Sequence, residues 1–106
     1  MRRVMVRYTV KPDRVDENER LVGDVYDELH RTGPGGIRYA TFRLADGVTF
    51  VHVASVETDD GTNPLAGVAA FGRFQENVGE RCDVAPVVTE LTEVGSYRLL
   101  GEAIGA

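Results

Sequence analysis

The sequence is short of the residues that mark several classes of small protein. It has no tryptophan, and its one cysteine, Cys82, cannot form an internal disulfide. Cys82 also has no second cysteine or histidine at metal-ligand spacing, which favours a small buried apolar residue over a reactive thiol. The composition therefore argues against a disulfide-stapled or zinc-bound domain.

Positive charge and long apolar runs are also scarce. The 12 basic residues face 17 acidic ones, and the resulting formal charge of −5 repels phosphate backbones. No apolar run approaches the roughly 18 residues of a membrane helix, and the opening MRRVMVRYTV lacks the apolar segment and cleavage site of a signal peptide. We therefore expect a cytoplasmic protein with no nucleic-acid partner and no membrane partner.

The length of the chain predicts one domain. Its 106 residues fall in the commonest size range for a single core. We expect a single domain over 1–106, with a core at about 3–98 and a C-terminal tail at 99–106. A chain this short buries only about two thirds of its extended surface, so a partner that covers more apolar area would stabilise it.

Four prolines divide the chain into segments with regular periods. Strict alternation over residues 3–10 predicts a strand, and one apolar stripe over 13–31 predicts a half-buried helix. The other predicted elements are strands at 36–44 and 48–57 around the hairpin turn Ala45-Asp46-Gly47, a helix at about 64–79, and a strand that begins after Pro86.

This order of elements predicts an α+β fold. The arrangement βαββαβ is the ferredoxin-like one, an antiparallel sheet with two helices on one face. Residues 48–56 are apolar on both sides of the strand, whereas a half-solvated strand alternates apolar with polar residues. We therefore expect a homodimer through the free sheet face, which would form a dimeric α+β barrel.

Several features in this order carry a resemblance to a known family. Val10-Lys11-Pro12 precedes the first helix, Phe71 and Phe74 stand three residues apart on the second, and V-x-x-L-x-x-V-G-S-Y runs from Val88 to Tyr97. Together they resemble the antibiotic biosynthesis monooxygenase family over about residues 3–98. The resemblance implies a dimeric α+β barrel, and two activities are associated with the family: cofactor-free oxygenation of phenolic rings and, in one branch, haem degradation.

The haem branch is the poorer match. It is implied to need a histidine on the second helix and a tryptophan on the third strand, and this chain has neither, with Val56 near the position of that tryptophan. His30, at the end of the first helix, suits the helix dipole better than it suits iron. We therefore expect no cofactor, and a small aromatic or phenolic substrate in a pocket between helices and sheet.

His52 is the candidate catalytic residue. It is the only histidine on a predicted strand, and an ordinary imidazole pKa near 6.5 suits a base at neutral pH. The family register places it towards the helices, in the pocket. The alternative is a core histidine that hydrogen-bonds a hydroxyl or a carbonyl. The catalytic interpretation requires His52 to line a cavity of at least about 300 Å³.

Other side chains have both a functional and a structural interpretation. Arg7 and Arg38 are cations that could hold an oxyanion or lie solvated on the sheet. The tyrosines could offer hydroxyls to a substrate or pack in the core. The remaining alternative is a non-catalytic homodimer of the same fold that binds a small ligand or has an accessory role. The candidate substrate-binding residues are Tyr8, Asn18, Tyr26, Tyr39 and Phe71.

Overall fold

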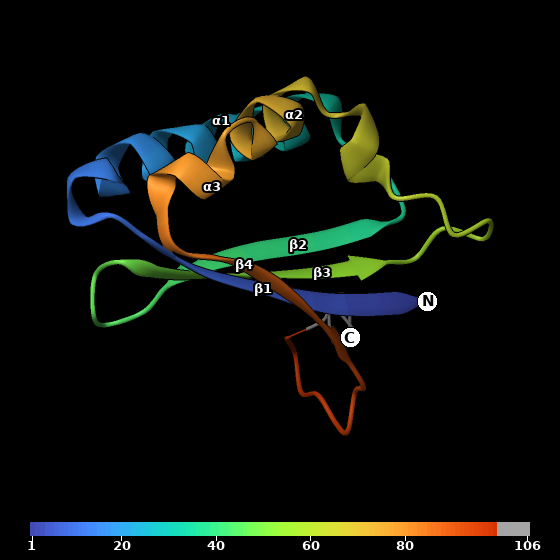
Figure 1. Ribbon diagram of the computed structural model, residues 1–106. Helices are drawn as coiled ribbons and strands as arrows, with labels where there is room; N and C mark the ends of the chain where they lie inside the picture. Colours follow the sequence, from blue (N-terminus) through green and yellow to red (C-terminus); the bar gives the residue numbers. More distant parts are fainter. Residues whose placement is uncertain (100–106) are drawn as a thin grey trace.

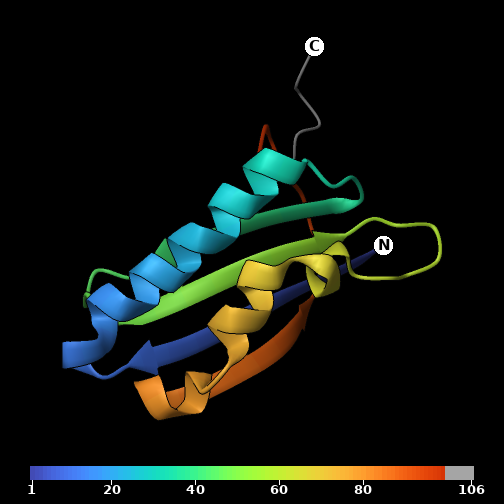
Figure 2. The same ribbon diagram turned by 90° about the horizontal axis from the view of Figure 1, so that it is seen from above.

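The computed structural model describes residues 1–99 and confirms the ferredoxin-like α+β fold (Figure 1). Its one sheet is antiparallel, with the strand order β2-β3-β1-β4. Figure 2 shows both helical segments crossing the same face of the sheet. The strands are β1 (Arg2–Val10), β2 (Ile37–Arg43), β3 (Thr49–Val56) and β4 (Cys82–Leu91).

The first helix follows the predicted stripe closely. A single 3-10 turn, η1 (Pro12–Arg14), leads into α1 (Val15–Thr32). Gly33 ends α1 in the left-handed conformation, at φ 57°, and donates its N–H to the Leu29 carbonyl. Within residues 1–99, no helix has both the length and the apolar character needed to cross a membrane.

The predicted second helix is broken into three pieces. They are η2 (Pro64–Gly67), α2 (Ala69–Gln75) and the single turn α3 (Val78–Arg81). The breaks fall where the backbone leaves the helical region: Val68 and Glu76 are extended, and Asn77 is left-handed with φ 57°. The Glu28 carboxylate of α1 compensates by accepting the N–H groups of Ala69 and Ala70 at the start of α2.

The hairpin turn is confirmed and the start of the last strand is not. Asp46 accepts the backbone N–H groups of Val48 and Thr49, and Gly47 has φ 80°. β4 begins at Cys82, before Pro86, and ends at Leu91. Because β4 is an edge strand, a proline without an N–H is tolerated there, next to a shift of register against β1.

The pairing register fixes which residues share a face. Val6 pairs with His52, and Thr41 pairs with His52 from the other side, so all three face the helices. The core cluster lies on this helix side, and Cys82, predicted to be buried, packs half-buried against it. The core cluster is formed by Tyr8, Val10, Val25, Phe50, Val68, Ala70 and Phe74.

The opposite side of the sheet, called the outer face, carries the alternate residues of the same strands. Arg7 pairs with Val51 and Arg38 with Ser55, so both arginines lie on this face. The idea that they hold an oxyanion in the helix-side pocket is therefore wrong. Apolar side chains on this face are exposed, among them Phe42 (53%), Val84 (54%), Val87 (58%) and Leu91 (37%).

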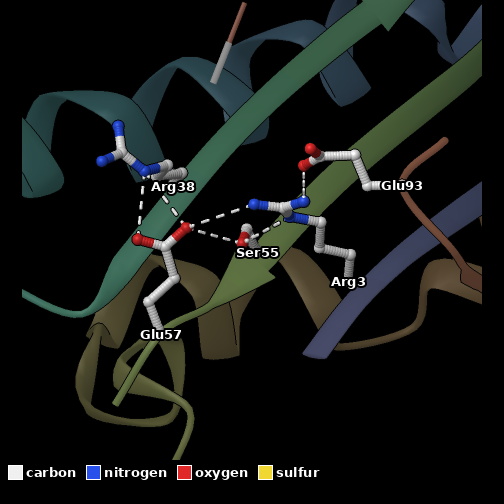
Figure 3. A network of polar contacts seen from close by, with 5 residues as sticks. All are labelled: Arg3, Arg38, Ser55, Glu57 and Glu93. Carbon is white, nitrogen blue, oxygen red and sulfur yellow. Dashed lines mark hydrogen bonds and ion pairs between the residues drawn. The ribbon is translucent and has the colours of Figure 1, made fainter. Parts of the chain in front are cut away.

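One end of the outer face carries a group of polar contacts, called the outer network (Figure 3). The Glu57 carboxylate accepts from Ser55 at 2.8 Å and from Arg38 at 3.1 Å, and it lies 3.9 Å from Arg3. Arg3 also donates to Glu93, in the segment that follows β4. The segment after β4 passes below the sheet in Figure 1, so it borders the outer face. Most of the predicted tail, 99–106, lies outside the described residues.

Candidate functional site

His52 stands in the middle of β3 and faces the helices with only 4% of its surface exposed. Both ring nitrogens contact hydroxyl groups of neighbouring strands. Nε2 lies 2.7 Å from the Tyr8 hydroxyl of β1. Nδ1 lies 2.6 Å from the Tyr39 hydroxyl and 3.0 Å from the Thr41 hydroxyl, both of β2. The imidazole is therefore fully hydrogen-bonded inside the fold.

The contacts continue from Tyr8 towards α1 and α3. The Asn18 amide nitrogen donates to the Tyr8 hydroxyl at 3.0 Å, and the Asn18 oxygen accepts from Arg81 Nε at 3.3 Å. Asn18 is completely buried, and Arg81 is only 2% exposed. A polar residue on the apolar stripe of α1 thus has a definite task, because it joins Arg81 to Tyr8.

On the other side of His52 the contacts end at α1. The Thr41 hydroxyl lies 2.8 Å from the Tyr26 hydroxyl. The whole connected set is called the core network. It spans the sheet from α3 to α1, and its members are Arg81, Asn18, Tyr8, His52, Tyr39, Thr41 and Tyr26.

Aromatic rings pack around this network. Phe74 of α2 lies 5.2 Å from the His52 ring, centroid to centroid, and the Arg81 guanidinium stands 5.3 Å above the Phe74 ring. Phe71 meets Tyr39 edge-on at 6.3 Å. Within residues 1–99, every buried side-chain nitrogen and oxygen has a hydrogen-bond partner. The buried polar groups of the network are therefore satisfied within the fold.

A cavity of about 450 Å³ opens beside this network, between the sheet and the α2–α3 segment. Tyr8, Tyr39, His52 and Phe71 line it. Asn18 and Tyr26 do not line the cavity. They lie behind its wall, where Asn18 hydrogen-bonds Tyr8 and Tyr26 hydrogen-bonds Thr41. The rest of the lining is largely apolar and includes Val4, Val6, Ala54, Leu65, Phe74, Val78, Pro86 and Val88. Cavities of this size and character hold small organic ligands.

Burial controls the charge of the ionisable groups at the cavity. It lowers the pKa of His52 to about 4, because an imidazolium loses its water shell there. Burial raises the pKa of Tyr8 and of Tyr39 above the ordinary phenol value. At neutral pH the imidazole and both phenols are therefore neutral.

The structure brings together all six candidate residues and adds three that sequence reasoning did not single out for the site. Thr41 stands opposite His52 in the register, and Phe74 was assigned only to the helix stripe. One feature of the sequence could have pointed to Arg81: it is a single cation between a short apolar helix and a strand. Nothing in a local pattern shows that this cation points inwards.

Three comparisons relate the chain to known proteins. No family model matches it, and no curated protein matches it. Among solved structures, an antibiotic biosynthesis monooxygenase superposes with a TM-score of 0.70 at 18% identity, over 90% of this chain and 100% of that one. Rv0793 from Mycobacterium tuberculosis gives 0.67 at 21% identity, over 90% and 96%.

A third solved structure has a stated activity. A variant of SnoaB, a cofactor-independent oxygenase from Streptomyces nogalater, superposes with a TM-score of 0.65 at 15% identity, over 92% of this chain and 96% of that one. At these identities the likeness concerns the backbone. The chain therefore has the fold of the antibiotic biosynthesis monooxygenases, along nearly its whole described length.

Proposed function

We propose that the chain is a cofactor-independent monooxygenase for a small phenolic ring compound. The observation that carries this proposal is the cavity of about 450 Å³, which exceeds the roughly 300 Å³ required and has Tyr8, His52 and Tyr39 side by side on its wall. The apolar lining suits the rings, and the two hydroxyls and the imidazole suit a phenolic oxygen. The named oxygenase of the same fold supports the choice of reaction.

The proposed chemistry requires the ligand to lose a proton. His52 takes this proton through one of its hydroxyl neighbours, and the electron-rich anion then passes an electron to dioxygen. The two radicals combine in a carbon–oxygen bond, and the peroxide anion takes back the proton held by His52. The hydroperoxide then loses water, with the hydrogen of the same carbon, to leave a quinone. Transfer from a phenol of pKa near 10 to a base of pKa about 4 is uphill by roughly 8 kcal/mol, a cost that typical enzymatic barriers accommodate.

A second candidate is a non-catalytic domain that binds the same class of ligand. It is favoured by one observation: both nitrogens of His52 already have hydroxyl partners, as in a histidine whose task is to hold the core. In this case the cavity binds rings and the core network only shapes its wall.

Oxygen consumption separates the two candidates. The protein is incubated aerobically with an anthrone and with a naphthohydroquinone, and dioxygen uptake is measured for wild type, His52→Ala and His30→Ala. The monooxygenase predicts uptake by wild type, loss of at least about 100-fold in His52→Ala, and no loss in His30→Ala, whose imidazole is exposed at the end of α1. Ring binding by calorimetry without uptake supports the binding domain instead.

We further propose that the working unit is a homodimer paired through the outer face. The exposed Phe42 of β2 and Val84, Val87 and Leu91 of β4 place apolar surface along both edge strands of it, and a second copy is the partner with a matching surface. Sedimentation at micromolar concentration is expected to give about twice the 11.6 kDa of one chain, and Phe42→Lys is expected to return it to one. A wild-type mass of one chain would contradict this pairing.

A further inference from the structure

Arg81 is a buried cation without a carboxylate partner among the described residues. Its side chain is 2% exposed, and the ion pairs formed within residues 1–99 do not include it. Its donors instead meet three neutral oxygens: the Glu76 carbonyl at 3.1 Å, the Phe74 carbonyl at 2.7 Å and the Asn18 side chain at 3.3 Å. A buried charge is costly, so its retention calls for a specific role.

Arg81 fixes the orientation of Asn18. A guanidinium can only donate hydrogen bonds, so the Asn18 atom that faces Nε must be the oxygen. The amide nitrogen of Asn18 then faces Tyr8 and donates to its hydroxyl oxygen at 3.0 Å. Tyr8 accepts this bond and keeps its own hydrogen for another partner.

The orientation passes on to His52. His52 Nε2, at 2.7 Å, is the acceptor within reach of the Tyr8 hydroxyl hydrogen, and donation to it satisfies that hydrogen and leaves Nε2 without one. A neutral imidazole then carries its hydrogen on Nδ1, which lies 2.6 Å from Tyr39 and 3.0 Å from Thr41. Every hydrogen bond from Arg81 to β2 thus runs in one direction, and such bonds strengthen one another.

We propose that Arg81 is a positioning residue that, through Asn18 and Tyr8, holds His52 as the Nδ1–H tautomer and gives the two cavity tyrosines opposite roles. The second part rests on the proposed monooxygenase function. Tyr8 passes its proton to Nε2 while its oxygen takes the proton of the ligand hydroxyl, leaving a ligand anion and an imidazolium. The Tyr39 oxygen accepts a hydrogen bond from Nδ1–H. The Tyr39 hydroxyl can then donate its hydrogen to Thr41 or to the ligand oxygen that becomes negative.

Nitrogen-15 NMR of the full-length protein tests the tautomer directly, because two-bond proton–nitrogen spectra show which ring nitrogen carries the hydrogen. The chain has two histidines, and the exposed His30 serves as the internal reference. Wild type is expected to show Nδ1–H at His52. An Nε2–H form as the main species would overturn the proposal without any variant.

Two substitutions then test the role of Arg81. In Asn18→Asp, the carboxylate accepts hydrogen bonds from both Arg81 and the Tyr8 hydroxyl. The Tyr8 hydrogen then no longer points to His52 Nε2, and the tautomer is expected to reverse to Nε2–H. In Arg81→Met, Asn18 is no longer held, and both tautomers are expected, whereas Arg81→Lys keeps a donor and restores Nδ1–H. An unchanged tautomer in both Asn18→Asp and Arg81→Met, with a dispersed amide spectrum, would overturn the role of Arg81.

The outcome is independent of turnover. If the tautomers behave as expected and no ring compound drives oxygen uptake, the positioning role of Arg81 stands and the proposed oxygenase function fails. If uptake occurs, Tyr8→Phe is expected to lower kcat by about 100-fold or more, as for a lost proton-transfer partner. Tyr39→Phe removes a donor to the anion and one acceptor of the Nδ1 hydrogen, whose other acceptor is Thr41, and it is expected to raise KM in addition to lowering kcat. Equal effects of the two substitutions on both constants would contradict the opposite roles.

Discussion

The two faces of the sheet are built from alternate residues of the same strands, and they are completed in different ways. On the helix side, His52 and Phe50 are nearly fully buried, and every buried side-chain nitrogen and oxygen of residues 1–99 has a hydrogen-bond partner. On the outer face, Phe42 and Val87 remain more than half exposed. A single chain buries the helix side of its sheet, and the exposed apolar residues of the outer face are the ones that a second copy would cover.

Truncating one phenylalanine on each face gives the largest expected contrast. Phe74 contacts His52, Tyr8 and the Arg81 guanidinium and is 7% exposed, so Phe74→Ala is expected to lower the free energy of unfolding by about 3–5 kcal/mol. Urea unfolding at low protein concentration measures this loss. Phe42→Ala, on the outer face, is the matched control, with an expected loss of under about 0.5 kcal/mol in the single chain. Equal losses would contradict the difference between the faces.

Acid is expected to weaken the helix side before it affects the carboxylates. The pKa of His52 is about 4 in the folded chain and near 6.5 in the unfolded one, so between these values the unfolded state binds more protons. Stability is full above pH 6.5 and falls as the pH drops towards 4. The expected loss between pH 7.5 and 4.5 is about 2.5 kcal/mol.

Denaturant unfolding at several pH values checks this loss. His52→Leu has no imidazole to protonate, so it is expected to be flat over the same range, whatever its stability at pH 7.5. His30→Gln, at an exposed site, is expected to keep the wild-type slope. The same slope in His52→Leu as in wild type would show that another group carries the pH dependence.

The core network shows how far sequence reasoning reached. The alternation in β1, the hairpin turn at Asp46-Gly47 and the stripe of α1 were enough for the fold, because these signals are local. Strand parity groups the residues that share a face, and the family register then placed the face of His52 towards the helices. The roles of these residues remain predictions.

Signals that depend on distant contacts were beyond the sequence. Arg81 is 63 residues from Asn18, and its inward direction follows from the left-handed Asn77, which turns the chain between α2 and α3. The break at Val68 depends on Glu28 of α1, which holds the start of α2. Residue periodicity in the 64–79 segment contains neither fact, so it predicted one continuous helix.

Removing one hydroxyl on each face gives a smaller contrast. Tyr8→Phe leaves the buried Asn18 amide and His52 Nε2 without their shared partner, so the expected loss of unfolding free energy is about 1–3 kcal/mol. Thr89→Val, on the exposed edge strand of the outer face, is the control and is expected to change stability by under about 0.5 kcal/mol. Thermal unfolding of both variants beside wild type measures the difference. A loss in Thr89→Val as large as in Tyr8→Phe would contradict it.

The smallest expected effect concerns the outer network, and it also tests whether the outer face is covered. Glu57 is the shared acceptor of Ser55 and Arg38, and these bonds lower the pKa of its carboxyl. In a single chain the ion pairs are partly exposed, so Glu57→Gln is expected to cost only about 1 kcal/mol, and Glu90→Gln, at an exposed pair with Arg2, about 0–0.5 kcal/mol.

A second copy on the outer face would remove this network from water, and charged groups that lose a partner out of water cost more. The cost of Glu57→Gln is therefore expected to grow with protein concentration, while that of Glu90→Gln, on the helix side of the edge strand, stays constant. Unfolding at two concentrations a hundredfold apart measures both. A Glu57→Gln cost that does not change with concentration would mean that this end of the outer face stays in water, and pairing would then have to centre on Phe42 and Val87.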